Sequence, residues 1–243
     1  MMTDDMPYPP LDRLKPVANG LWVVDGAPMR FLGMVPIPLR MTVARVGDGM
    51  MLVSPTRHDP ALAAAIAALG PVRHLVAPNT VHWLHMRAWQ AAYPEARSWG
   101  APGLAARSAV RRSGLRLDAV LGEAAPAAWG GVFDMAVVPG GFGFHEVALL
   151  HRTSRTAILT DLVQNFEPAR LSAPMAAAVR LLGNDGGTPL HLRAVLRRRR
   201  DDAAAAARRV IDAEPERVVI AHGRWFEQGG AAALRHALRW LVP

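Results

Sequence analysis

Short apolar runs, each ended by turn residues, mark this chain as a mixture of strands and helices. The segments 40–45 (RMTVAR) and 50–54 (MMLVS) are two such runs joined by Gly47-Asp48-Gly49, which predicts a β-hairpin. Similar runs predict further strands at 21–25, 72–77, 97–100, 132–138, 146–151, 156–163 and 217–221.

Helix signals fall between these runs. Asp59 suits the N-cap and Pro60 the first helical position, and Gly70-Pro71 ends the apolar stripe that follows. Further helices are predicted in a stretch ending at Tyr93 and at 102–112, 175–182, 203–213 and 234–241.

Both halves of the chain therefore supply strands followed by helices. Two sheets packed face to face with helices outside would bury all of these apolar faces. We expect an α/β fold, a four-layer α/β/β/α sandwich. We also expect one domain over residues 1–243, with 1–20 as an extended N-terminal segment.

Composition narrows the class of protein. The chain has 243 residues, 51% of them hydrophobic and 20% charged, which excludes a disordered chain. Cysteine is absent, so disulfides, thiolate nucleophiles and Cys-ligated metals are excluded. The first ten residues do not resemble a secretory signal, and the longest apolar stretch, 61–69, is too short to span a bilayer. We expect a cytoplasmic protein.

The formal net charge of +8 raises the question of an anionic partner. The basic residues are scattered except for the run Arg197 to Arg200, which Asp201 and Asp202 follow directly. That pattern favours a solvated helix end or turn over a phosphate-binding patch. We therefore expect a small-molecule substrate and do not expect a nucleic-acid partner.

Candidate chemistry lies at the ends of three predicted strands. His82 and His85 follow strand 72–77, Asp161 lies near the end of run 156–163, and His222 follows strand 217–221. Parallel strand ends meet at one edge of a sheet, and imidazole with carboxylate is a common ligand set for zinc. The sequence therefore predicts a metal site formed by His82, His85, Asp161 and His222.

Each of these residues also has an ordinary structural explanation. A single histidine is more often a core residue bonded to a carbonyl, Asp161 could cap the following segment, and His222 could be a turn residue. His145 is the best-placed spare ligand, and we expect His151 and Arg152 to form an internal hydrogen bond or a salt bridge. The glycine-rich segment 140–144 lacks the P-loop pattern and is expected to be a tightly turned or flexible loop.

The order of these motifs resembles the metallo-β-lactamase fold superfamily. The phrases IPLRMTV, LVSPT, AALGPVRHLVAPN, AYPEA, APGL and HRTSRTAILTDLVQNF further resemble DUF4336, a family of uncharacterised bacterial proteins with that fold. The resemblance covers about 21–166 well. It implies the α/β/β/α sandwich, a metal-dependent hydrolase-like activity, and a site built from the histidine motif, a strand-end aspartate and a late histidine.

The chain departs from the superfamily pattern His-x-His-x-Asp-His at two positions. Thr80 stands at the first histidine and Leu84 at the aspartate, and segment 140–144 replaces the mid-chain Gly-His. One of the two metal sites implied by the resemblance has thus lost two histidines. The other could keep His85 and His222 beside Asp161, which predicts a mononuclear site.

Such a site would hold one zinc, iron or manganese ion, or none if it is fully degenerate. Asp161 and His82 are the expected catalytic residues, and the reaction would be hydrolysis of an unidentified ester, lactone, amide or phosphoester. Two alternatives remain: a non-catalytic member that binds an anionic partner through its basic surface or cleft, and a redox protein with iron. The apolar strand edge at 34–38 could pair with a second subunit.

Overall fold

Neighbouring residues of the strands point into different apolar layers. In strand β4 (Gly49–Val53), Met51 belongs to one buried cluster and Leu52 to another. In strand β8 (Phe133–Pro139), Val137 and Val138 divide in the same way. Because side chains alternate across a strand, this pattern requires both faces of each sheet to be covered.

The computed structural model describes residues 7–31 and 35–242. The strands form a seven-stranded sheet in the order β1 to β7 and a four-stranded sheet in the order β13-β10-β9-β8. The first sheet contains β1 (Lys15–Ala18), β2 (Leu21–Phe31), β3 (Val35–Val46), β4, β5 (Val72–Ala77), β6 (Arg97–Gly100) and β7 (Ala119–Val120). The second contains β8, β9 (His145–His151), β10 (Thr156–Ile158) and β13 (Arg217–Val219), and a small ribbon pairs β11 (Gln164–Asn165) with β12 (Asp185–Gly187).

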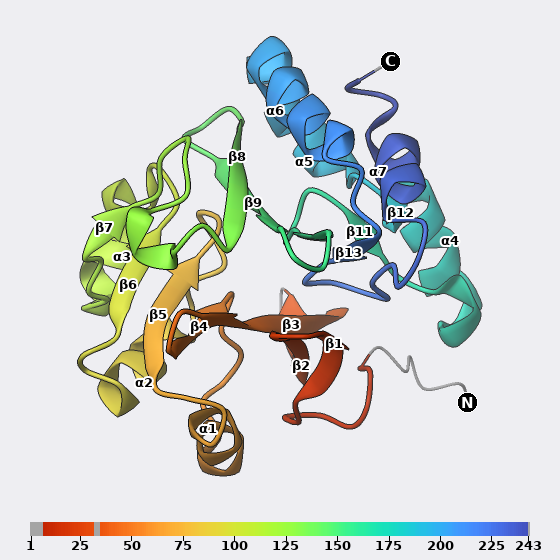
Figure 1. Cartoon of the computed structure of the whole chain (residues 1–243). Helices are drawn as coiled ribbons and strands as arrows, with labels where there is room; N and C mark the ends of the chain where they lie inside the picture. The colour runs from red at the N-terminus through yellow and green to blue at the C-terminus, as the bar shows by residue number, and fades with distance from the viewer. Residues whose placement is uncertain (1–6, 32–34, 243) are drawn as a thin grey trace.

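Helices cover the outer faces of both sheets. They are α1 (Pro60–Ala67), α2 (Met86–Ala92), α3 (Ser108–Ser113), α4 (Ala173–Leu182), α5 (Leu190–Leu196), α6 (Arg200–Asp212) and α7 (Gly230–Leu238), with short 3-10 turns at Leu104–Ala106, Ala127–Trp129, Pro168–Arg170 and Arg197–Arg199. Figure 1 shows α1 to α3 on one side of the sheet pair and α4 to α7 on the other.

Three large apolar clusters separate the four layers. One contains side chains of both sheets and fills the space between them, a second joins the first sheet to α1, α2 and α3, and a third joins the second sheet to α5, α6 and α7. Helix α4 packs over a smaller cluster of its own around Phe166. The predicted α/β/β/α sandwich is confirmed.

The structure contains the elements that turn and cap residues predicted. Strands β3 and β4 pair antiparallel from Val46↔Gly49 onward, as the Gly-Asp-Gly sequence predicts. Asp59 Oδ1 accepts from the backbone N–H of Leu62 at 2.9 Å and so caps α1. Strand β5 has the predicted bounds, 72–77.

Several predicted elements were wrong in extent, and two of them have a clear physical reason. The helix expected over 102–112 is divided into a 3-10 turn and α3, because Arg107 between them is extended with φ of −67° and ψ of 127°. The strand expected over 156–163 stops at Ile158, and the following residues leave the sheet. The sequence also did not predict α5.

The proposed subunit edge at 34–38 lies partly outside the described residues, because 32–34 are not among them. None of the helices in the described part of the chain combines the length and apolar character needed to cross a membrane.

The layered core makes a direct prediction about stability. Leu75 is fully buried in the cluster beneath α1 and α2, whereas Leu181 on α4 is 77% exposed. We expect Leu75→Ala to lower the free energy of unfolding by about 2–5 kcal/mol through lost burial and a residual cavity. Urea denaturation measures the change. The matched control Leu181→Ala should shift it by less than about 0.5 kcal/mol, and equal losses would contradict the packing described.

Candidate metal centre

Two imidazoles and one carboxylate converge at one end of the sheet pair. His82 Nε2 and His222 Nε2 lie 3.2 Å apart. Asp161 Oδ2 is 3.4 Å from His82 Nε2, and Asp161 Oδ1 is 3.2 Å from His222 Nε2. Among the described residues these three are the one group of histidines and carboxylates close enough to share a metal ion.

The three side chains come from loops that follow the carboxyl ends of core strands. His82 follows β5, Asp161 follows β10, and His222 follows β13, which pairs parallel with β10. Since β5 belongs to the first sheet and the other two strands to the second, the group bridges the two halves of the sandwich. The convergence expected from strand ends therefore holds for these three residues.

Asn79 ties the loop of His82 to the loop of Asp161. Its Oδ1 accepts from the backbone N–H groups of Val81 and His82, both at 2.8 Å. Its Nδ2 donates to Asp161 Oδ2 at 2.7 Å and to Thr160 Oγ1 at 2.9 Å. Asn79 is fully buried, so these bonds fix the position of the carboxylate relative to the imidazole.

Glu146 holds the backbone that carries Asp161. Its Oε1 accepts from Thr160 N–H at 2.8 Å, and its Oε2 accepts from Asp161 N–H at 2.9 Å and Leu162 N–H at 3.0 Å. Burial and the nearby charge of Asp161 raise the pKa of Glu146, against the effect of the three N–H groups. These bonds also explain why strand β10 ends early, since the backbone turns toward Glu146 instead of continuing the ladder.

Arg40 fixes the loop of His222 from the other sheet. Its Nη1 donates to the backbone oxygens of Ile220 at 2.8 Å and Gly223 at 2.7 Å, which flank the histidine. Its Nη2 pairs with Asp25 Oδ1 at 2.6 Å, and both side chains are almost fully buried. A buried arginine with this many acceptors is a rigid anchor.

Bonds on the far side of each imidazole orient the nitrogens that face the cluster. His222 Nδ1 lies 2.8 Å from the carbonyl oxygen of Pro38, which can only accept, so Nδ1 carries a proton and neutral His222 has a free lone pair on Nε2. His82 Nδ1 lies 2.7 Å from Ser54 Oγ. Ser54 has a φ of 52°, a strained backbone for a serine.

The charges of the group support one another. Burial alone would raise the pKa of Asp161, but His82 and His222 hold it well below its usual range. Burial opposes a charge on His82, yet Asp161 and Glu146 raise its pKa above the ordinary value. The environment thus keeps an ionised carboxylate beside the imidazoles, which suits a cation, whereas the raised pKa of His82 means that this imidazole must release a proton when it binds one.

His85 is not part of the cluster. It stands at the position before α2 with φ of −97° and ψ of −4°, and burial followed by the charge of Arg57 lowers its pKa. The spacing i, i+3 places two side chains on one face only within a helix, and α2 begins after His85, at Met86. The group therefore contains His82, where the resemblance suggested His85 beside Asp161 and His222.

The other positions of the superfamily pattern have different surroundings. Thr80 is buried and accepts a hydrogen bond from Arg107 Nη2 at 3.1 Å, and Leu84 is 54% exposed. His145 also lies outside the cluster, and its Nδ1 is buried with no hydrogen-bond partner among the described residues. The internal hydrogen bond expected for His151 is present, since His151 Nδ1 lies 2.7 Å from Ser154 Oγ.

Sequence reasoning did not identify Glu146, Arg40 or Ser54 as site residues. Each lies in a strand or at a strand end, and the sequence around it has no feature that distinguishes it from other strand sequences. Asn79 had a usable signal, because an asparagine one residue after the proline that follows a buried strand is typical of a side-chain-closed turn.

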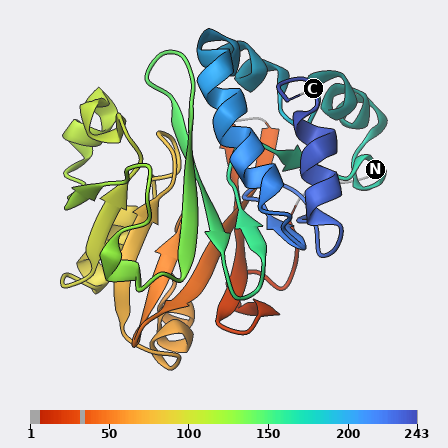
Figure 2. The ribbon, with the colours of Figure 1, turned by 45° about the horizontal axis from the view of Figure 1, so that its top comes forward.

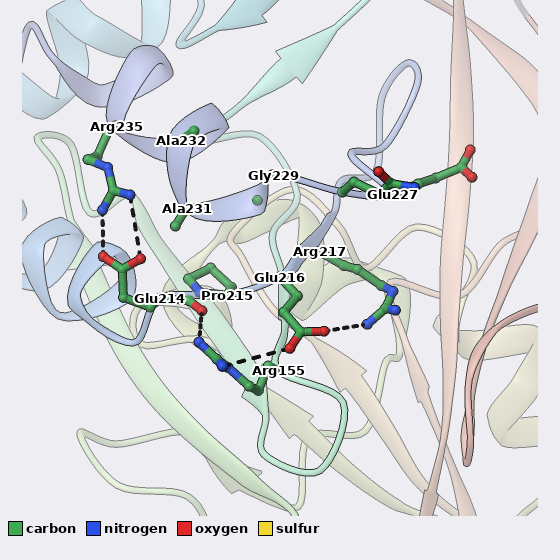
Figure 3. Close-up of a pocket in the computed structure, with 12 residues that line it drawn as sticks. Arg155, Glu214, Pro215, Glu216, Arg217, Glu227, Gly229, Ala231, Ala232 and Arg235 are labelled. Atoms are coloured by element: carbon green, nitrogen blue, oxygen red, sulfur yellow. Dashed lines mark hydrogen bonds and ion pairs between the residues drawn. The ribbon is translucent and has the colours of Figure 1, made fainter.

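A separate surface pocket lies away from this group. It has a volume of about 470 Å³ and includes Arg217 at the start of β13, the opposite end of that strand from His222. Figure 3 shows Arg235 joined to Glu214, and both Arg155 and Arg217 joined to Glu216, while no dashed line reaches Glu227. Its charges are compensated internally, so it offers no chemistry comparable to the three-residue group.

The two-sheet architecture has close counterparts among solved structures. A metallo-β-lactamase from Erythrobacter litoralis, solved with β-mercaptoethanol in its active site, aligns with a TM-score of 0.66 at 15% identity over 93% of this chain and 94% of that one. A metallo-β-lactamase from Pontibacter korlensis aligns with 0.63 at 14% identity over 94% and 98%. FIM-1 of Pseudomonas aeruginosa in its mono-zinc form aligns with 0.62 at 15% identity over the full length of both chains. The fold is that of the metallo-β-lactamases.

Sequence comparison identifies the family within this fold. Residues 19–181 match the profile of the domain of unknown function DUF4336, and the chain belongs to that family. No curated protein matches the chain in sequence.

The Glu146 network predicts a stability effect that an exposed glutamate lacks. In Glu146→Gln an amide NH₂ replaces one acceptor oxygen, so at least one backbone N–H group loses its partner. We expect a loss of about 1–3 kcal/mol in unfolding free energy, measured by thermal or urea denaturation. Glu123→Gln removes a glutamate that is 74% exposed and should change it by less than about 0.5 kcal/mol. Equal effects would show that Glu146 is not an anchor.

Proposed function

We propose that this protein is a metal-dependent hydrolase-like enzyme whose site holds one ion through His82, Asp161 and His222. The observation that carries the proposal is the mutual spacing of the three ligand atoms. Zinc bonds of about 2.0–2.1 Å at tetrahedral angles separate neighbouring ligand atoms by about 3.3 Å. The distances here are 3.2, 3.4 and 3.2 Å.

The surroundings of the ligands also fit a cation. His222 offers a lone pair because its other nitrogen donates to a carbonyl, an arrangement typical of metal-binding histidines. His82 offers the same if its Nδ1–H donates to Ser54 Oγ. A donor set of two imidazoles and one carboxylate suits zinc, iron or manganese.

A bound ion of this kind would activate a water molecule for attack on an ester, lactone, amide or phosphoester of a small molecule. The chain's own residues would then manage the proton and the geometry. Asp161, held ionised and bonded to Asn79 through Oδ2, would accept the proton of that water, and His82 would help to hold the ion through Nε2. Leu84 stands where the superfamily pattern has an aspartate and cannot accept a proton.

The non-catalytic alternative has its support in the residues replaced around the site. Thr80 pairs with Arg107, so a guanidinium group lies where the pattern has its first histidine. Under that alternative His82, Asp161 and His222 would only stabilise the fold, and the protein would bind an anionic partner without catalysing a reaction. Metal content separates the two possibilities.

The first prediction concerns metal content. Protein purified without chelators and reloaded with zinc, iron or manganese should hold about one ion per chain, measured by elemental analysis. His222→Ala and Asp161→Asn should lose it, because each removes one of three ligands. His85→Ala and His191→Ala are the controls and should retain it. Less than about a tenth of an ion per chain after reloading, or equal loss in the controls, would overturn the proposal.

The second prediction concerns Ser54, which contacts an imidazole and not the ion itself. Ser54→Ala removes the partner of His82 Nδ1 and should weaken zinc affinity by about 10- to 100-fold while leaving the stoichiometry unchanged. Competition with a chromophoric chelator measures the affinity. Ser108→Ala, at an exposed position on α3, is the matched control. An unchanged affinity in Ser54→Ala would exclude this orienting role.

A further inference from the structure

Two arginine side chains lie against the ring of Trp240 in the helical layer outside the second sheet, and a third arginine, Arg239, lies next to them. The guanidinium carbons of Arg193 and Arg197 lie 5.5 and 6.0 Å from the centre of the Trp240 ring. Arg239 precedes the tryptophan directly, and its Nη1 contacts His236 Nε2 at 2.9 Å and donates to the backbone oxygen of His236 at 2.8 Å, which leaves Nη2 for a ligand. Arg193 belongs to α5, Arg197 follows that helix, and the other residues follow or end α7, the dark blue helix beside α6 in Figure 2.

Arg193 is held in place by the surrounding backbone. Its Nε donates to the carbonyl oxygen of Thr188 at 2.8 Å, and Thr188 is fully buried. A Cβ atom at Gly183 or Gly187 would lie 3.3 or 3.5 Å from Arg193 Nη2, so the glycines leave room for the guanidinium group. The side chain is therefore half-buried and preorganised, unlike a solvated surface arginine.

The positive charge of this cluster has no carboxylate counterpart. Within residues 7–31 and 35–242, no aspartate or glutamate forms an ion pair with Arg193, Arg197 or Arg239. Burial, together with the charges of Arg239 and Arg197, lowers the pKa of Arg193, which reflects the mutual repulsion. By contrast, Arg199 in the same arginine run pairs with Asp202 at 2.6 Å.

The sequence favoured a solvated helix end for the run Arg197 to Arg200, and this holds for Arg199. Arg197 and Arg198 instead turn toward aromatic rings. Arg198 lies 4.3 Å from the centre of the Phe142 ring, and Phe142 is 74% exposed. Two arginine–aromatic contacts thus follow each other along this surface.

We propose that Arg193, Arg197 and Arg239 bind the phosphate group of a ligand beside the ring of Trp240. Guanidinium groups donate in pairs to phosphate oxygens, and a phosphate has enough free oxygens for several arginines at once. An anion at this position would relieve the repulsion within the cluster. The site is independent of the metal centre, whose residues belong to other loops.

The phosphate could belong to a small molecule or to a polynucleotide backbone, and Phe142 distinguishes the two sources. Exposed aromatic rings next to arginines are typical of surfaces on which the bases of single strands stack. A polynucleotide would therefore use Phe142 in addition to the cluster, whereas a small phosphate ligand would not.

The experiment uses the full chain and two probes at low salt, inorganic phosphate in calorimetry and a fluorescent ten-residue oligouridylate in anisotropy. We expect saturable binding of at least one probe that weakens as salt is raised. Arg197→Gln combined with Arg239→Gln should weaken it about tenfold or more. Both arginines are exposed, so this variant is expected to fold, and near-ultraviolet circular dichroism checks that it does.

The matched control is Arg152→Gln combined with Arg155→Gln, which lowers the net charge equally at exposed positions paired with Asp134 and Glu216. It should leave binding within about twofold. If the oligonucleotide binds more tightly than inorganic phosphate, and Phe142→Ala weakens that binding, the proposal is supported with a polynucleotide as the source of the phosphate. Binding of inorganic phosphate that Phe142→Ala leaves unchanged would support it with a small ligand. Binding of neither probe, or equal loss in the control, would overturn it.

Discussion

The ionised carboxylate of Asp161, buried between two imidazoles, is the constraint on which the rest of this site depends. A carboxylate withdrawn from water is unfavourable unless hydrogen bonds and opposite charge replace the lost hydration. Here Asn79 supplies a donor at 2.7 Å, and the two histidines supply the favourable electrostatics. Two buried side chains hold the local backbone in the position that this requires. Asn79 accepts a hydrogen bond from the N–H of Val81 in its own turn, and Glu146 accepts one from the backbone N–H of Asp161.

The network also explains a departure from regular structure. Strand β10 has three residues, although apolar residues recur as far as Val163. The backbone N–H groups of Thr160, Asp161 and Leu162 bond to a side chain instead of a neighbouring strand. The shortened strand is thus part of the geometry of the site.

The sequence predicted the layered fold because its signals are local. Alternating apolar residues, the Gly-Asp-Gly turn and the Asp59 cap each act within a few residues, and the structure contains all three. The sequence also predicted the positions of His82, Asp161 and His222, since each follows a recognisable strand. It did not predict Glu146 or Arg40, whose partners are distant in sequence: Arg40 contacts carbonyls about 180 positions away. His85 was grouped with the ligands from its spacing to His82 and from its match to the superfamily motif, and neither determines the direction of a side chain outside a helix.

Strand β3 reaches across to the second sheet twice, through the carbonyl of Pro38 to His222 and through Arg40 to the residues around it. The imidazole of His82 belongs to the first sheet and that of His222 to the second. The distance between the two rings therefore depends on how closely the two sheets pack against each other. A change in sheet packing would also change the distance between the imidazoles, so the geometry of the site depends on a rigid interior.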